Sequence, residues 1–229
     1  SEGLSAFELL SGQGFSFMQE AMPRVQLPFS KIPDWAILIQ LGFGSARSAE
    51  NSMIKLYEKI CCQKLVYDGV LAKSQKESDA LWKLRETIPE ANRRIGAIAS
   101  HDLSLPLSEI STFIERAQVE LSSIGRFRVN CFGHLGDGNL HFNIFPETGK
   151  TKDQYSSQRD VIESTVHDLT AEFKGSVSAE HGIGRSKVKD LIKYSSPVKL
   201  DLMRKLKGVF DPNGICLLYT SDAADECLC

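Results

Sequence analysis

The sequence has no apolar run of the roughly 18 residues or more that a membrane-spanning helix requires. Its first ten residues have neither the basic start nor the apolar core of a secretory signal peptide. Lys and Arg are scattered and the formal net charge is -2, so the basic surface typical of nucleic-acid binding is also missing. We therefore expect no transmembrane segment, no signal peptide and no nucleic-acid partner.

Cysteine spacing argues against a Cys-x-x-Cys zinc site and against a disulfide-rich fold. Cys61 and Cys62 are adjacent, Cys131 lies in a strand-like stretch, and the other three of the six cysteines follow Ile215. No Cys-x-x-Cys pair of the kind that holds zinc occurs, and no disulfide framework is indicated. The default expectation is therefore a reducing compartment.

What remains is the composition of a globular protein, with 229 residues, 42% hydrophobic and 24% charged. The sequence starts at Ser1 rather than Met, inside what reads as a helix, so we expect a fragment of a longer protein. The stretch FDPNGI at residues 210–215 is a plausible helix exit. Residues 216–229 then have no clear periodicity, and we expect them to be a non-native or disordered tail.

Hydrophobic periodicity predicts interleaved strands and helices. Strands are expected at residues 33–44, 64–73 and 102–106, and a hairpin at 126–145. Helices are expected at residues 6–21 with a break near Gly12, 48–63, 74–88, 108–121, 153–176, the end of 176–194, and 197–212. Ser48 and Ser108 are the expected N-caps, Pro89 and Gly125 the expected stops, and Gly175 closes the helix from residue 153. This order predicts an α+β fold with a largely antiparallel sheet, helices packed on one face, and C-terminal helices.

The stretch GHLGDGNLHFN, residues 133–143, places two histidines around a glycine-rich turn. With Asp137-Gly138 as a two-residue hairpin loop, His134 lies opposite His141. Opposed residues have Cβ atoms about 4.5–5.5 Å apart, so both rings can reach one metal ion. Alternation places Asn143 and Phe132 on the same face, and the opposite, apolar face carries Val129, Cys131, Leu135, Leu140, Phe142 and Ile144.

A second stretch, SAEHGIGR, offers Glu180 and His181 at another strand-to-turn junction. Neighbouring residues in an extended chain point to opposite sides, so one would bind a metal ion and the other would act beside it. Two histidines and one glutamate with an open position are typical of a catalytic metal site. Asp137 is expected to form the turn rather than bind metal, and His101 and His167 are expected to have no site role.

These stretches, together with LWKLRETIPEA, HDLSLPLSEI and FDPNGI in the same order, resemble the C-terminal domain of FAD-linked 2-hydroxyacid dehydrogenases. The family includes D-lactate dehydrogenases, the glycolate oxidase flavin subunit and D-2-hydroxyglutarate dehydrogenase. The resemblance covers residues 1–215 and implies a ferredoxin-like arrangement. It also implies an N-terminal FAD-binding domain of the vanillyl-alcohol oxidase type, which is absent from this sequence. No GxGxxG fingerprint follows a strand in this chain.

The resemblance implies a role for each residue that matches a family motif. The ligands of a divalent metal, usually zinc, would be His134, His141 and Glu180. His181 would be the general base and would also contact the substrate. Arg85 would bind the substrate carboxylate and Asn143 would hydrogen-bond the substrate, while Asn213 is a candidate contact to the flavin.

Three departures from the family pattern bear on these roles. Ser100 stands where hydroxyglutarate enzymes carry a lysine, which makes a dicarboxylate substrate less certain. Pro89 stands where those enzymes have a threonine. Cys216 interrupts the family's usual continuation after the helix exit, which supports the interpretation of the tail and removes residues that would approach the flavin.

The resemblance implies oxidation of a D-2-hydroxy acid to the 2-oxo acid, with hydride transfer to FAD. Electrons would pass on to a quinone, a cytochrome or an electron-transfer flavoprotein. The location would be the bacterial cytoplasm or the mitochondrial matrix, and a homodimer is a further expectation. Two alternatives stay open: a flavin-independent, metal-dependent hydrolase using the same residues, and a non-catalytic module whose metal has a fourth protein ligand.

Overall fold

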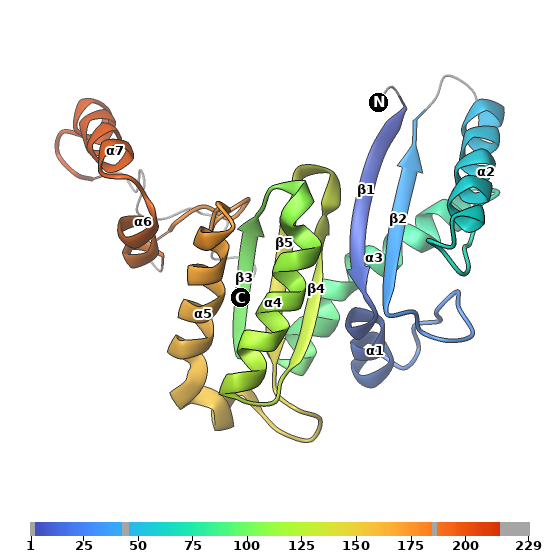
Figure 1. The fold of residues 1–229 in the computed structure, drawn as a ribbon, viewed down its shortest axis with the longest axis horizontal. Coiled ribbons are helices and arrows are strands. Elements are labelled where there is room, and N and C mark those ends of the chain that lie inside the picture. The colour runs from blue at the N-terminus through green and yellow to red at the C-terminus, as the bar shows by residue number, and fades with distance from the viewer. Residues whose placement is uncertain (1–2, 43–45, 185–186, 216–229) are drawn as a thin grey trace. The chain divides into compact units, whose positions relative to one another are not determined.

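The computed structural model describes residues 3–42, 46–184 and 187–215 (Figure 1). The fold is α+β, and the strand pairs formed within each part of the chain are antiparallel, as predicted. The chain divides into two compact units. Unit 1 consists of Ser1–Ile95 with Asn130–Gly136, and unit 2 consists of Gly96–Val129 with Asp137–Cys229.

The strands of unit 1 are β1 (Leu4–Ser11), β2 (Trp35–Leu41) and the part of β4 (Arg128–His134) that begins at Asn130. β1 pairs with β2 along its length, and its second half pairs with β4. In that second register Glu8 lies opposite His134. The middle strand β1 therefore presents an acidic residue directly across from one of the predicted metal ligands.

Three helices complete unit 1: α1 (Gly12–Ala21), α2 (Ala46–Cys62) and α3 (Gln75–Ile95). α3 reaches both paired strands, because Trp82 donates a hydrogen bond to Gln40 of β2 and Arg85 donates one to Glu8 of β1. Fully buried side chains of α1 and α3 form the core of the unit: Phe15, Phe17, Met18, Ile88 and Ala91.

Residues 4–11 correct the first expectation from the sequence, because they form strand β1 rather than the start of a helix. Ala, Glu and Leu in this stretch favour a helix locally, but pairing with a strand on each side satisfies the backbone of β1 and outweighs propensity. The helix begins only at Gly12, whose N–H donates to the carbonyl of Asp34 at 2.7 Å. A Cβ at this position would lie 2.2 Å from the Pro33 carbonyl oxygen, which explains the glycine.

Pro89 does not end its helix, contrary to expectation, because α3 continues for six residues to Ile95. An interior proline costs a helix about 3 kcal/mol. The side chains of Ile88, Ala91 and Asn92 around it are buried, and this packing offsets the cost of the missing hydrogen bond.

Two smaller expectations for unit 1 are also wrong. Residues 64–73 form no strand, and Tyr67 among them is 98% exposed, so no apolar face holds the segment in a sheet. α2 begins at Ala46, two residues before the expected cap Ser48. The strand predicted at residues 33–44 is confirmed as β2.

Unit 2 contains β3 (Ala99–Ser104) and β5 (Asn139–Phe145), which pair antiparallel, with α4 (Ile110–Ile124) and α5 (Arg159–Glu172). Figure 1 shows these two helices side by side over the strands. Their apolar stripes form one core with the strand side chains: Leu103, Phe113, Leu140, Phe142, Ile144, Ile162 and Val166 are all buried. The predicted strand 102–106 and both hairpin strands are thus present.

The helix starts and the turn of this region differ from expectation. A 3-10 turn, Leu107–Glu109, precedes α4, and the Ser108 hydroxyl donates to Glu109 instead of capping the helix. Gly125 does end α4, as predicted. The loop after β4 is not the two residues Asp137-Gly138: β4 ends at His134, a 3-10 turn covers Leu135–Asp137, and β5 begins at Asn139.

Two further helices follow, α6 (Val188–Tyr194) and α7 (Pro197–Phe210). Lys193 and Tyr194 both donate to Asp168, which ties α6 to α5. Ser196 caps α7 by accepting the N–H of Lys199 at 3.2 Å. The helix predicted at residues 197–212 is confirmed.

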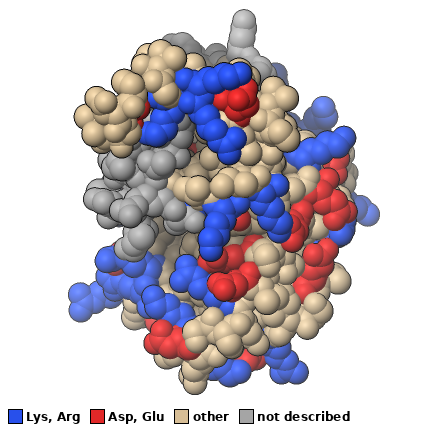
Figure 2. Space-filling model, turned by 90° about the vertical axis from the view of Figure 1, so that its left-hand side faces the viewer, with Lys and Arg blue, Asp and Glu red and all other residues tan. Residues whose placement is uncertain are grey.

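On the face viewed in Figure 2, Lys and Arg side chains are interspersed with Asp and Glu side chains.

Among the described residues no helix is both long and apolar enough to cross a membrane. The expected tail, residues 216–229, lies outside the part of the chain that the structure describes.

Candidate active site

Five of the seven predicted site residues fall into two clusters, one in each unit, and Asn143 and Asn213 lie outside both clusters. The Arg85 cluster, in unit 1, consists of Glu8, Arg85, Phe132 and His134. The His141 cluster, in unit 2, consists of Asp102, Asn139, His141, Glu180 and His181.

In the Arg85 cluster, the buried carboxylate of Glu8 joins two predicted site residues. Nε of Arg85 donates to Oε2 of Glu8 at 2.9 Å, and Nδ1 of His134 lies 2.7 Å from Oε1. The Arg85 and Glu8 side chains are only 10% and 4% exposed. A guanidinium and a carboxylate this far from water require each other, because either charge alone would be costly to bury.

The geometry of these contacts fixes which atoms face away from Glu8. An ionised carboxylate can only accept, so the proton between it and His134 belongs on Nδ1, and Nε2 becomes the basic nitrogen of the ring. Arg85 uses Nε for this contact, and its guanidinium carbon also lies 4.9 Å from the Phe132 ring centroid. The guanidinium group is therefore held by two contacts, one polar and one aromatic.

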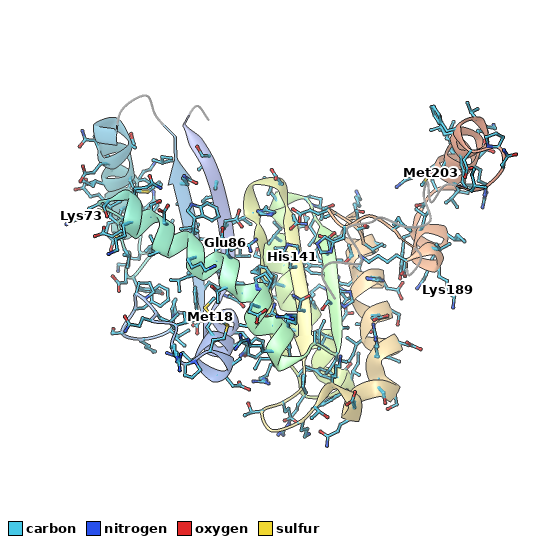
Figure 3. The ribbon with its side chains drawn as sticks, turned by 180° about the vertical axis from the view of Figure 1, so that it is seen from behind. Met18, Lys73, Glu86, His141, Lys189 and Met203 are labelled. Carbon is cyan, nitrogen blue, oxygen red and sulfur yellow. The ribbon has the colours of Figure 1, made fainter. Side chains whose placement is uncertain are left out.

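In the His141 cluster, the ring of His141, which is labelled on β5 in Figure 3, has a carboxylate near each nitrogen. Nδ1 lies 3.9 Å from Oδ1 of Asp102, and Nε2 lies 3.8 Å from Oε2 of Glu180. The His181 ring is beside it, with centroids 5.7 Å apart and planes inclined by 32°. The structure therefore brings His141, Glu180 and His181 together, as the sequence predicted for a shared site.

Asp102 is the most connected residue of the His141 cluster. Its Oδ2 accepts the backbone N–H groups of Ala179, Glu180 and His181, and its Oδ1 accepts from the Asn139 side chain at 2.8 Å. Burial by itself would raise the pKa of this carboxyl. The N–H groups of His181 and Glu180 and the Asn139 amide outweigh that effect, so the pKa is lowered overall and Asp102 stays ionised.

Asn143 lies on β5, two residues beyond His141, and is buried. Its Oδ1 accepts the backbone N–H of His101 at 3.3 Å. This contact anchors the side chain to β3, where Ser100 is its register partner. Asn213, the candidate flavin contact, lies in an exposed turn after α7.

His101 and His167 have partners that the sequence did not reveal. Both are buried, and Nδ1 of His101 lies 3.0 Å from Nε2 of His167. Nδ1 of His167 in turn lies 3.1 Å from the Asp190 carboxylate. The two rings meet because α5 packs against β3, which is a contact between elements that the sequence does not reveal.

Sequence reasoning missed Glu8 and Asp102. Glu8 is an acid inside an apolar stretch, FELL, which is a weak signal of a buried charge. Asp102 occurs in the motif HDLSLP without a role. In the sequence, Glu8 is 77 residues from its partner Arg85 and 126 residues from its partner His134. Asp102 is 77 to 79 residues from the loop residues that it binds. No local spacing in the sequence therefore points to these contacts.

Comparison with known proteins gives the class to which this fold and these clusters belong. The family model of FAD linked oxidases, C-terminal domain, matches residues 1–217, so the chain belongs to this family. A solved structure of 4-ethylphenol oxidase from Gulosibacter chungangensis shares the fold, with a TM-score of 0.56 and 13% identity, covering 94% of this chain and 47% of that one.

Curated relatives narrow the comparison within the family. The chain is 37% identical over 219 residues to mitochondrial D-2-hydroxyglutarate dehydrogenase of Bos taurus, covering 95% of this chain and 39% of the relative. The protein of that name from Arabidopsis thaliana is 34% identical, over 95% of this chain and 38% of the relative. D-2-hydroxyglutarate dehydrogenase of Stutzerimonas stutzeri is 32% identical, over 93% and 45%. The chain thus spans less than half the length of these relatives.

Proposed function

We propose that this chain is the substrate- and metal-binding part of an FAD-dependent dehydrogenase that oxidises a D-2-hydroxy acid to the 2-oxo acid. The single observation that carries the proposal is the His141 cluster, where His141, Glu180 and His181 meet. Membership of the FAD-linked oxidase family and the names of the relatives support it.

We propose His134, His141 and Glu180 as the ligands of one divalent cation. Imidazole and carboxylate donors suit zinc and its neighbours, and three protein ligands leave a position open for substrate. The surroundings of the two rings fit this role. The Glu8 carboxylate lies 2.7 Å from Nδ1 of His134, within hydrogen-bond distance, and such carboxylates orient metal-binding histidines. The Asp102 carboxylate lies 3.9 Å from Nδ1 of His141, while Glu180 lies near Nε2.

Arg85, Glu8 and His181 have the remaining roles in the proposed reaction. Arg85 binds the substrate carboxylate, and Glu8 holds its guanidinium plane in place. A bound divalent cation would polarise the substrate hydroxyl and lower its pKa. His181 accepts the hydroxyl proton. FAD, held mainly by the part of the protein outside this chain, would accept the hydrogen on the α-carbon as hydride.

The substrate class is a D-2-hydroxy acid, such as D-lactate, glycolate or the D-2-hydroxyglutarate in the relatives' names. All share the carboxylate and hydroxyl that Arg85 and the cation would recognise. Ser100, which stands where the resemblance places a second carboxylate-binding lysine, is exposed and offers no charge. We expect a second carboxylate to be bound less tightly than by an enzyme with that lysine.

Metal analysis of the purified chain tests the metal site. After Zn²⁺ loading and desalting, we expect about one Zn²⁺ per chain, and a loss of it in the His134→Ala, His141→Ala double variant. His167→Gln, a change at a histidine outside both clusters, is the matched control and should keep the metal. Failure of the folded wild-type chain to retain Zn²⁺ would contradict the proposed site.

A further inference from the structure

The loop that carries Glu180 and His181 has no regular secondary structure of its own. Backbone pairing on this side of β3 consists of one bridge, in which Ser104 and Ser176 exchange both backbone hydrogen bonds, and of one longer bond from the Ala179 N–H to the Asp102 carbonyl at 3.3 Å. After that bridge the chain runs through Gly182 and Gly184, both with positive φ, before α6 begins at Val188. Something other than a sheet or helix must therefore hold residues 179–181.

The side chain of Asp102 supplies that support. One oxygen, Oδ2, accepts three successive backbone N–H groups, from Ala179 at 3.1 Å, Glu180 at 2.7 Å and His181 at 2.9 Å. Successive N–H groups that converge on one point form a concavity for an anion, and in this chain its own carboxylate fills it. The Asp102 side chain is only 3% exposed, so water does not compete for these bonds.

The same carboxylate is also fixed relative to His141. Asp102 and His141 are direct partners in the β3–β5 register, so their side chains share one face of the strand pair. Oδ1 of Asp102 lies 3.9 Å from Nδ1 of His141 and accepts from the Asn139 amide at 2.8 Å. Asp102 thereby links the strand that carries His141 to the loop that carries Glu180.

We propose that Asp102 is a positioning residue that sets the loop of residues 179–181 so that Glu180 faces His141 and His181 stands beside it. This inference rests on the proposed function for what the three residues do, but the anchoring itself concerns only this chain. Loss of Asp102 is expected to release the loop, separate Glu180 from His141 and weaken metal binding, although Asp102 is not among the proposed ligands.

Two variants and one control test the proposal. Asp102→Ala removes all the side-chain bonds. Asp102→Asn removes the charge but keeps the shape, and the Asn139 amide can turn to accept from it, since Asn139 Oδ1 has no partner among the described residues. Asp190→Asn is the matched control, because Asp190 also contacts a histidine but lies outside both clusters.

The first readout is amide hydrogen exchange of the metal-free chain. We expect the N–H groups of Glu180 and His181 to exchange at least about tenfold faster in Asp102→Ala, with Asp102→Asn in between. The Ala179 N–H should change less, because it also donates to the backbone carbonyl of residue 102. The amides of Ser104 and Ser176, which bond to each other, should keep their protection. The second readout is Zn²⁺ affinity, expected to fall about tenfold to a hundredfold in the same order and to stay unchanged in Asp190→Asn.

The outcomes separate the inference from the proposed function. Unchanged exchange at residues 179–181 in the folded variants would overturn the positioning role. Faster exchange with unchanged Zn²⁺ affinity would also overturn it, because Asp102 would then be structural only. If Asp102→Ala does not fold, Asp102→Asn decides alone. Absence of Zn²⁺ binding in the wild type would refute the metal site, while the exchange data would still decide whether Asp102 holds the loop.

Discussion

Glu8 and Arg85 form a buried ion pair in which Nε of the guanidinium donates to a carboxylate oxygen at 2.9 Å. The other oxygen of the same carboxylate contacts His134, so a single acid connects the residue proposed to bind the substrate with a proposed metal ligand. Removing this acid therefore has consequences for stability and for the site.

Replacement of Glu8 by Ala is expected to lower the free energy of unfolding by about 3–5 kcal/mol, because it leaves the Arg85 charge buried without its partner. Urea unfolding of the purified chain measures this. Glu90→Ala is the control, since Glu90 pairs with Arg93 and Arg94 at the surface and its loss should cost under about 1 kcal/mol. Equal losses in the two variants would contradict the view that burial makes the Glu8–Arg85 pair special.

His101 gives a prediction for pH. Burial lowers its pKa well below the ordinary value, and the charges of His167, Lys187 and Arg159 add to the effect. The unfolded chain, with a pKa of about 6.5 at this residue, binds a proton more readily than the folded chain. The stability due to His101 is therefore complete above about pH 6.5 and is lost as the pH falls below that value.

Thermal unfolding between pH 7.5 and pH 5 checks this dependence. The wild type should lose stability across this range, and His101→Asn, which has no imidazole to protonate, should show a flatter profile. An identical pH profile for wild type and His101→Asn would show that His101 does not contribute.

Metal binding should itself stabilise the chain. A ligand that binds only the folded state at a concentration of 100 times its Kd adds about 2.7 kcal/mol to the unfolding free energy. We expect Zn²⁺ to raise the melting temperature, a chelator to reverse the rise, and His141→Ala to abolish it. The rise should shrink as the pH falls, because imidazole must lose its proton to bind metal. A rise of equal size in His141→Ala would place the Zn²⁺ elsewhere.

The strands and helices with strong periodicity were predictable from the sequence. Residues 35–41 form an apolar run of strand length closed by glycine, and residues 197–210 have helical spacing that starts with a proline after a serine, so each local signal agrees with the fold. Residues 4–11 were misassigned because their helix formers are overruled by two partner strands. Pro89 was misread because the packing that tolerates it comes from distant parts of unit 1.

The site residues that stand in short sequence motifs were predictable. His134, His141, Glu180 and His181 stand in two glycine-rich stretches whose residue types indicate metal and acid–base chemistry. The carboxylates that organise them, Glu8 and Asp102, act through contacts across the sheet and to a loop. Such contacts have no fixed spacing in the sequence, so only the three-dimensional structure reveals them.

The proposed roles also predict that this chain alone does not turn over 2-hydroxy acids, because in the proposal FAD would be bound mainly outside it. Reduction of an artificial electron acceptor such as a tetrazolium dye, with D-lactate or D-2-hydroxyglutarate as substrate, measures this. Steady turnover by the purified chain would contradict the proposal. Binding of the acid, in contrast, should not need the flavin.

The most direct test of a shared site for metal and substrate is the absorption spectrum of the chain loaded with Co²⁺ in place of zinc, recorded while D-2-hydroxyglutarate or D-lactate is added. We predict a saturable change in the visible bands as the hydroxy acid occupies the open position on the metal. The affinity for the acid obtained from this titration should be at least about tenfold lower in Arg85→Met, which cannot bind the carboxylate. An unchanged spectrum with both acids, or an equal response in Arg85→Met, would contradict a shared site for the metal and the 2-hydroxy acid.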